Sequence, residues 1–138
     1  MAERALNILL VEDDEVDVMN VQRAFERNHL TNALYVAGNG LEALELLRGK
    51  TIPKERRLIL LDLNMPKMNG IEFLEALRAD PDLASTPVVV LTTSNDDQDK
   101  IDAYNFNVAG YLLKPVTFSS FCERMATLDK YWALVEMP

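Results

Sequence analysis

The sequence predicts an α/β fold in which five parallel strands, in the order 2-1-3-4-5, form a doubly wound sheet with helices on both faces. Short apolar runs bounded by turn-forming residues recur along the chain, and such runs are typical of strands buried on both faces of a parallel sheet. Each run is followed by apolar residues at helical spacing, so that strand and helix alternate. This alternation, with short connections, implies a parallel sheet with helices on both faces and right-handed crossovers.

The predicted elements form strand–helix pairs in chain order. The pairs cover residues 5–11 and 16–28, 33–37 and 41–47, 58–62 and 71–77, 88–91 and 101–106, and 110–113 and 118–134. The first helix is predicted from the recurrence of Val16, Met19, Val21, Ala24, Phe25 and Leu30. Gly49 ends the second helix, and Asp80 with Pro81 ends the third. Asp14, between the first strand and the first helix, is expected to cap that helix.

Length and composition narrow the class of protein. We expect a single domain over residues 1–138, with a core of about 5–130 and an extended C-terminal helix and tail. A net charge of −8 argues against nonspecific binding to nucleic acids. The first thirty residues are acidic and hold no uninterrupted apolar region that would predict a signal peptide or membrane anchor. The single cysteine, Cys122, excludes an internal disulfide, is expected in the core, and fits a cytoplasmic location.

Polar side chains stand where the predicted strands end. They are Glu12 and Asp13 after the first strand, Asp62 after the third, Thr92 after the fourth and Lys114 after the fifth. Open α/β sheets bind ligands outside the carboxyl ends of their strands, and the first and third strands are neighbours in the predicted order. The sequence therefore predicts that these five side chains line one shallow pocket.

The carboxylates of this pocket indicate a divalent cation. Three neighbouring carboxylates repel one another, and a bound cation would relieve the repulsion. Hard oxygen ligands from Glu12, Asp13 and Asp62, with the backbone carbonyl of Asn64, suit Mg²⁺. A magnesium ion beside a carboxylate and a lysine favours phosphoryl transfer, with in-line attack by Asp62 and charge neutralisation by Lys114. The Thr92 hydroxyl could then donate to an oxygen of the acyl phosphate.

Four segments together resemble the receiver domain of two-component response regulators. They are Leu-Leu-Val-Glu-Asp-Asp at 9–14, Asp-Leu-Asn-Met-Pro-Lys-Met-Asn-Gly at 62–70, Leu-Thr-Thr at 91–93 and Tyr-Leu-Leu-Lys-Pro at 111–115. The resemblance implies a flavodoxin-like receiver fold. It also implies a signalling switch that catalyses its own phosphorylation and dephosphorylation, with Asp62 accepting the phosphoryl group from a histidine kinase and slowly losing it to water.

The resemblance also implies roles for single residues. These are metal binding for Glu12 and Asp13, switching for Thr92 and Tyr111, and contact with the phosphoryl group and carboxylate for Lys114. It suggests a cis peptide bond between Lys114 and Pro115. Two positions differ from the commonest family pattern: the first acidic residue is Glu12 instead of Asp, and Thr93 stands where a smaller residue is frequent.

Further features are similar to the small regulators that pair with phytochrome histidine kinases. These features are a long loop before the third strand, the segment 91–94 followed by acidic residues, and an extended aromatic last helix. That helix has one apolar stripe toward the sheet, and Tyr131 and Leu134 lie off it. Such an additional strip favours a partner interface, so we expect a homodimer through the fourth helix, fifth strand and last helix. A tail that folds back on the core is the alternative.

Two other functions remain open at this point. A degenerate receiver would bind partners without phosphorylation, although Asp62, Thr92 and Lys114 are all present. A metal-dependent phosphatase with an aspartate nucleophile would use a similar sheet. Such enzymes usually carry a second Asp two positions after the nucleophile, where this chain has Asn64.

Overall fold

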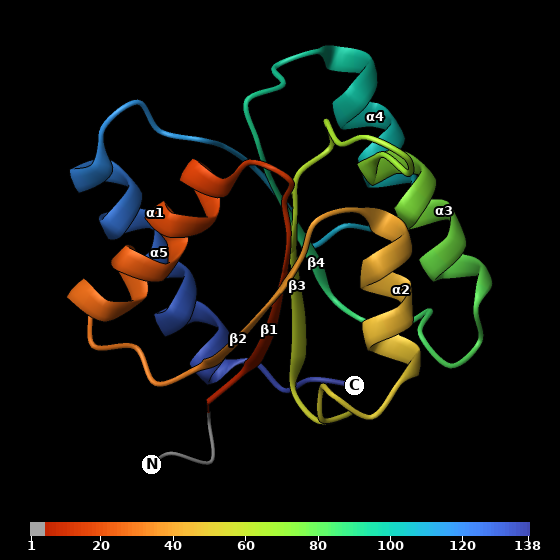
Figure 1. Ribbon diagram of the computed structural model, residues 1–138, viewed down its shortest axis with the longest axis horizontal. Helices are drawn as coiled ribbons and strands as arrows, with labels where there is room; N and C mark the ends of the chain where they lie inside the picture. The colour runs from red at the N-terminus through yellow and green to blue at the C-terminus, as the bar shows by residue number, and fades with distance from the viewer. Residues whose placement is uncertain (1–4) are drawn as a thin grey trace.

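The computed structural model describes residues 5–138 and contains the predicted five strands and five helices in alternation (Figure 1). In chain order they are β1 (Asn7–Val11), α1 (Glu15–Arg27), β2 (Ala33–Ala37), α2 (Gly40–Arg48), β3 (Arg57–Leu61), α3 (Gly70–Ala79), β4 (Val88–Thr92), α4 (Asp97–Asn105), β5 (Gly110–Leu113) and α5 (Phe118–Leu134). All four strand pairings are parallel and the order is β2-β1-β3-β4-β5, so the predicted fold class is confirmed.

The sheet lies between two layers of helices. In Figure 1, α1 and α5 cover one face, and α2, α3 and α4 cover the other. Successive strand residues alternate between two apolar clusters, as period-two side-chain geometry requires. On β1, Leu9 and Val11 belong to the cluster under α2 and α3, whereas Ile8 and Leu10 belong to the cluster under α1 and α5. Burial on both faces is why the central strands are continuous apolar runs.

The strands β1 and β3 are neighbours in register, and this pairing positions the site. Asn7 lies opposite Arg57, and Val11 lies opposite Leu61. The chain therefore leaves both strands at the same level, and the N–H of Asp62 donates to the carbonyl of Val11 at 3.0 Å. Strand β3 ends at Leu61, one residue earlier than predicted, so Asp62 is the first residue after the strand.

Two helices differ in detail from the sequence prediction. Helix α4 begins at Asp97, four residues before Ile101, because Asp96 caps it by accepting from the N–H of Asp99. Its buried residue is Ala103, and Ile101 is exposed. In α1, Val16 and Met19 are also exposed, so these two apolar residues lie on the solvent side and do not belong to the core face.

The last helix and the tail after it are held against the core by apolar and polar contacts. Phe121, Cys122, Met125 and Trp132 are buried between α5 and the sheet, which confirms the predicted stripe and the core position of Cys122. Val135 and Met137 pack on the same cluster, so the tail folds back on the core. Within residues 5–138, no helix has the length and apolar character needed to cross a membrane.

Candidate functional site

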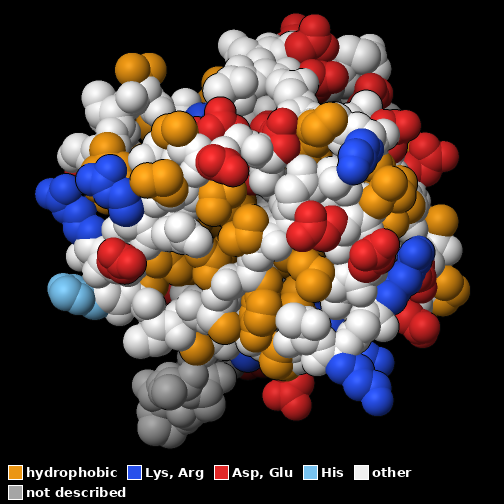
Figure 2. All heavy atoms as spheres, in the orientation of Figure 1, with side chains coloured by type: hydrophobic (Ala, Val, Ile, Leu, Met, Phe, Trp, Pro, Cys, Tyr) orange, Lys and Arg blue, Asp and Glu red, His pale blue; other side chains and the backbone are white. Residues whose placement is uncertain are grey.

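Three carboxylates converge at the carboxyl end of the sheet. Carboxylate oxygens of Glu12, Asp13 and Asp62 all lie within 4.8 Å of one another. Glu12 is positioned by β1 and by its own N–H, which donates to the carbonyl of Ala37 at 2.9 Å. Acidic side chains, red in Figure 2, gather on the upper part of the face shown, above these strand ends. The structure thus brings together the acids that the topology predicted to meet.

The three carboxylates differ in their exposure to water. Glu12 is only 3% exposed and Asp62 only 6%, whereas Asp13 is exposed. Burial raises the pKa of Glu12 to about 7; the hydrogen bond from Lys114 opposes this rise and the charge of Asp62 adds to it. When a carboxyl group is buried beside a second carboxylate, a nearby cation stabilises its charged form. This donor set of carboxylate oxygens therefore fits a hard divalent ion.

Lys114 supplies the positive charge of the site. Its backbone N–H donates to the carbonyl of Thr92 at 2.8 Å, which fixes the end of β5 beside β4. Its ammonium nitrogen lies 2.9 Å from Glu12, 2.6 Å from Asp17 and 3.6 Å from Asp62. Burial alone would lower the pKa of Lys114, but the hydrogen bonds to Asp17 and Glu12 and the nearby Asp62 charge raise it above its usual value.

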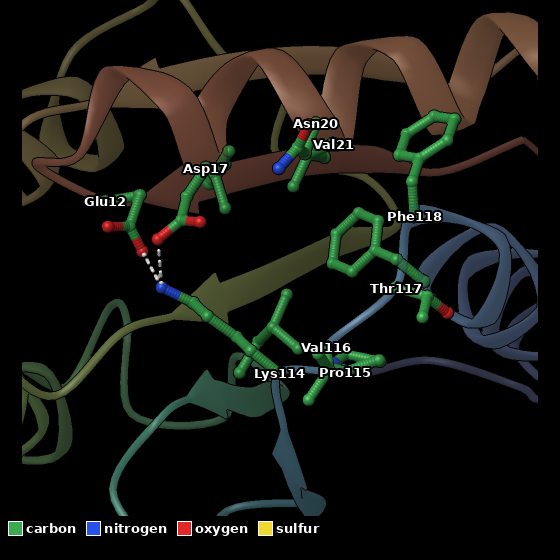
Figure 3. Close-up of a pocket in the computed structure, with 12 residues that line it drawn as sticks. Glu12, Asp17, Asn20, Val21, Lys114, Pro115, Val116, Thr117 and Phe118 are labelled. Carbon is green, nitrogen blue, oxygen red and sulfur yellow. Dashed lines mark hydrogen bonds and ion pairs between the residues drawn. The ribbon is translucent and has the colours of Figure 1, made fainter.

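Asp17 is a member of this cluster that the sequence reasoning missed. It belongs to the first turn of α1, and Asp14 caps that turn by accepting from the N–H groups of Val16 and Asp17. The capping role predicted for Asp14 is therefore confirmed. Figure 3 shows Lys114 extending from the end of β5 toward Glu12 and Asp17, with the Asp17 side chain directed down from α1. The position of Asp17 three residues after the cap was the available signal.

A small cavity adjoins this cluster on the side of α1. Its volume is about 230 Å³, and Figure 3 shows residues that line it. Asp17 and Asn20 of α1 form one wall, and the segment from Lys114 to Phe118 forms another. The cavity is thus an extension of the acidic site between the first helix and the end of the sheet.

Thr92 and Tyr111 are connected through one loop residue, Ser94. Thr92 is fully buried, and its hydroxyl oxygen accepts from the N–H of Ser94 at 3.3 Å. The Tyr111 hydroxyl donates to the carbonyl of Ser94 at 2.9 Å, and the Ser94 hydroxyl donates to Asp99 of α4 at 2.6 Å. Burial raises the pKa of Tyr111. These contacts link the end of β4 to α4 and β5.

The loop after Asp62 is constrained at both ends. The N–H of Asn64 lies 3.5 Å from a carboxylate oxygen of Asp62, at the limit of a hydrogen bond. At the other end, a Cβ on Gly70 would lie 2.7 Å from the Asp62 carbonyl oxygen, so only glycine permits this close approach. Asn69 and Glu72 form a capping box that starts α3. Metal coordination by the Asn64 carbonyl stays a prediction.

The expected cis bond between Lys114 and Pro115 is wrong. Among residues 5–138 the structure has no cis peptide bond. The trans form of a bond before proline is favoured by about 0.5–1 kcal/mol. With this bond trans, Lys114 already reaches Glu12 and Asp17.

Comparisons with known proteins agree with this geometry. The family model for the response regulator receiver domain matches residues 8–126. The chain is similar to the probable methanogenesis regulatory protein FilR2 of Methanothrix harundinacea (strain 6Ac), with 39% identity over 136 residues, 95% of this chain and 86% of that protein. It is also 37% identical to response regulator Rcp1 of Synechocystis sp. (strain ATCC 27184 / PCC 6803 / Kazusa) over 128 residues, 91% of this chain and 87% of Rcp1.

Solved structures give the same assignment. The phosphorylated cyanobacterial phytochrome response regulator RcpA superposes with a TM-score of 0.85 at 32% identity, covering 97% of this chain and 99% of RcpA. The Mn²⁺-bound form of Rcp1 gives a TM-score of 0.82 at 35% identity, covering 96% of this chain and 99% of that one. The match extends over most of the chain and includes β1, β3, β4 and β5 with their terminal polar residues. The chain therefore belongs to the response regulator receiver domain family.

Proposed function

We propose that this chain is a stand-alone response regulator that accepts a phosphoryl group on Asp62 from a histidine kinase in a Mg²⁺-dependent reaction. The observation that carries the proposal is the convergence of Glu12, Asp13 and Asp62, with the Lys114 ammonium 3.6 Å from the Asp62 carboxylate. Similarity to Rcp1 and RcpA supports a phytochrome-type kinase as the donor. A cytoplasmic location is part of the same proposal.

The proposed metal ligands are Glu12, Asp13, Asp62 and the backbone carbonyl of Asn64. The acids meet the requirement of Mg²⁺ for oxygen ligands at close range, and one of the similar structures contains Mn²⁺. When bound, the ion would neutralise negative charge on the transferred phosphoryl group. Glu12 is buried with a raised pKa, and a cation beside it would favour its charged form.

The proposed reaction uses Asp62 as the nucleophile. One of its oxygens attacks the phosphorus of the kinase phosphohistidine, the P–N bond breaks, and the histidine nitrogen leaves with the electron pair and takes a proton. Lys114 stabilises the charge on the phosphoryl oxygens, and the Thr92 hydroxyl donates to one of them in the product. Water later attacks the phosphorus, which restores the Asp62 carboxylate and releases inorganic phosphate.

The output of this switch is proposed to be contact between proteins, including a homodimer. Thr92 and Tyr111 both bind Ser94, so movement of Thr92 toward a phosphoryl group would alter the support of the Tyr111 ring. The face formed by α4, β5 and α5 carries large exposed apolar side chains, namely Ile101, Tyr104, Leu113, Tyr131 and Leu134. Phosphorylation needs only to favour one of two existing conformations for association to follow.

Phosphoryl uptake tests the first part of the proposal. The native protein is incubated with labelled acetyl phosphate and Mg²⁺, beside Asp62→Asn and the control Asp82→Asn, which removes an exposed carboxylate elsewhere. Native protein and the control should incorporate label, and Asp62→Asn should remain folded and incorporate none. Absence of label in the native protein would favour a degenerate receiver, and steady turnover of small phosphate esters would favour a phosphatase.

Size-exclusion chromatography with and without beryllofluoride, a phosphoryl mimic, tests the dimer. Leu134 in α5 is 83% exposed and Leu41 in α2 is 48% exposed, so both can accept a charged residue without loss of core packing. Leu134→Asp should abolish the dimer, and Leu41→Asp should leave it intact. A dimer that survives Leu134→Asp, Tyr131→Asp and Tyr104→Asp would refute this interface.

A further inference from the structure

We propose that Asp17 is a positioning residue that holds the Lys114 ammonium on the α1 side of the site and competes for it with a phosphoryl group on Asp62. This inference rests on the proposed phosphorylation of Asp62. Through Asp17, helix α1 would then influence the equilibrium between the unphosphorylated and phosphorylated states. Asp17 acts through Lys114, and the described ion pairs include none that would join it directly to the site of the reaction at Asp62.

The distances at the Lys114 ammonium carry the inference. The nitrogen lies 2.6 Å from Asp17 and 2.9 Å from Glu12, which are short charge-assisted hydrogen bonds. Its distance to Asp62 is 3.6 Å, beyond a hydrogen bond. The strong contacts of Lys114 are therefore with α1 and the end of β1, and its weakest ionic contact is with the proposed phosphoryl acceptor.

The Asp17 contact is well placed to break when the site is occupied. Asp17 is fixed by the capped first turn of α1, but its side chain is 31% exposed, against 8% for Asp62. Water can replace Lys114 at Asp17 more easily than at the buried acids. A phosphoryl group adds negative charge beside Asp62, so the ammonium would move toward it and away from Asp17. The Asp17 bond is then the contact that phosphorylation has to overcome.

Removal of the Asp17 charge should therefore favour the phosphoryl-bound state. At saturating Mg²⁺, we expect Asp17→Asn to bind beryllofluoride about two- to fivefold more tightly than the native protein, the scale of one partly exposed ion pair. Asp17→Glu keeps a carboxylate within reach of Lys114 and should return the affinity toward the native value. These affinities can be measured by NMR titration of the amide resonances of residues 92–94.

Two further variants distinguish the effect of the Asp17–Lys114 ion pair from the effect of removing any negative charge at this end of α1. Asp14→Asn removes one negative charge from the same helix end and preserves the cap, because asparagine caps helices as well as aspartate does. Its affinity for beryllofluoride should change less than about twofold, since Asp14 has no ion pair with Lys114 among the described contacts. In a Lys114→Gln background, Asp17→Asn should have no further effect, because the residue through which Asp17 acts is gone.

The outcomes distinguish this inference from the proposed function. If native protein binds beryllofluoride and Asp17→Asn binds it equally or more weakly, the inference is refuted and the proposed function stands. The inference is also refuted, alone, if Asp14→Asn matches Asp17→Asn or if the effect persists without Lys114. If the folded native protein binds no beryllofluoride at saturating Mg²⁺, the proposed function is refuted, and the inference with it.

Discussion

Replacing Arg78 with alanine is expected to lower the free energy of unfolding by about 4 kcal/mol. The Arg78 guanidinium, from the last turn of α3, donates to four backbone carbonyls: those of Ala84, Thr86, Phe106 and Asn107, at 2.7–3.1 Å. Each such bond contributes about 1 kcal/mol net, and alanine leaves all four carbonyls without this donor. Two of the acceptors lie between α4 and β5, shortly before Tyr111 of the proposed switch.

Urea unfolding followed by Trp132 fluorescence measures this loss. Trp132 is the only tryptophan of the chain and is 5% exposed, so its emission reports unfolding of the packed α5. Arg78→Lys should cost about 2 kcal/mol, because an ammonium cannot reach four carbonyls in the fork geometry of a guanidinium. With a total stability of about 5–15 kcal/mol for a typical domain, the variants should still fold.

An exposed arginine on a neighbouring helix provides the control. Arg48 of α2 has a side chain that is 55% exposed and an ion pair with Asp80 at 3.0 Å. Arg48→Ala should cost less than about 1 kcal/mol, as surface ion pairs usually do. The reasoning would be refuted if Arg78→Ala lost no more than Arg48→Ala, or if Arg78→Lys were as stable as the native protein.

Three other substitutions test separate features of the site and its supports. Without divalent cations, the free energy of unfolding should fall by about 3 kcal/mol as the pH rises from 4.5 through 7. Folding raises the pKa of Glu12 from 4.5 to about 7, so in this pH range the native state holds a proton that the unfolded chain releases. Urea unfolding at about pH 5 and pH 8 measures this dependence, and Glu12→Gln should remove it. Gly70→Ala should lower the free energy of unfolding by about 1–3 kcal/mol, because the added Cβ would displace the backbone at Asp62. The same displacement should weaken Mn²⁺ binding measured by calorimetry, and an unchanged Mn²⁺ affinity would contradict this. Tyr111→Phe should cost about 1 kcal/mol in urea unfolding by removing the hydrogen bond to Ser94, and a neutral result would count against that bond.

The strand order and the meeting of Glu12, Asp13 and Asp62 could be predicted because both follow from local pattern and topology. Apolar runs of strand length identify the sheet, and a 2-1-3-4-5 order places the ends of the first and third strands together. The same argument brings Lys114 to the site from the edge strand. Each step depends on the position at which a strand or helix ends, and turn-forming residues mark these positions in the sequence.

Contacts that depend on side-chain direction could not be predicted in this way. The ion pair between Asp17 and Lys114 joins residues 97 positions apart, and its formation depends on the rotation of α1 against the sheet. The start of α4 was missed for another reason: its first turn is polar and lacks apolar periodicity, although Asp96 had the residue type of a cap. Apolar periodicity also does not fix which residues are buried: Met19 belongs to the pattern that predicts the first helix, yet it is 55% exposed.

The central claim, that the acids at the ends of β1 and β3 hold a divalent cation beside Asp62, is tested most directly by crystals grown with Mn²⁺. Anomalous scattering locates the ion without assumptions about its ligands. We predict a peak between the carboxylates of Asp13 and Asp62, in contact with the Asn64 carbonyl, and the Lys114 ammonium within reach of Asp62. Saturating Mn²⁺ with no peak at these carboxylates, or a peak at another acidic cluster alone, would contradict the claim.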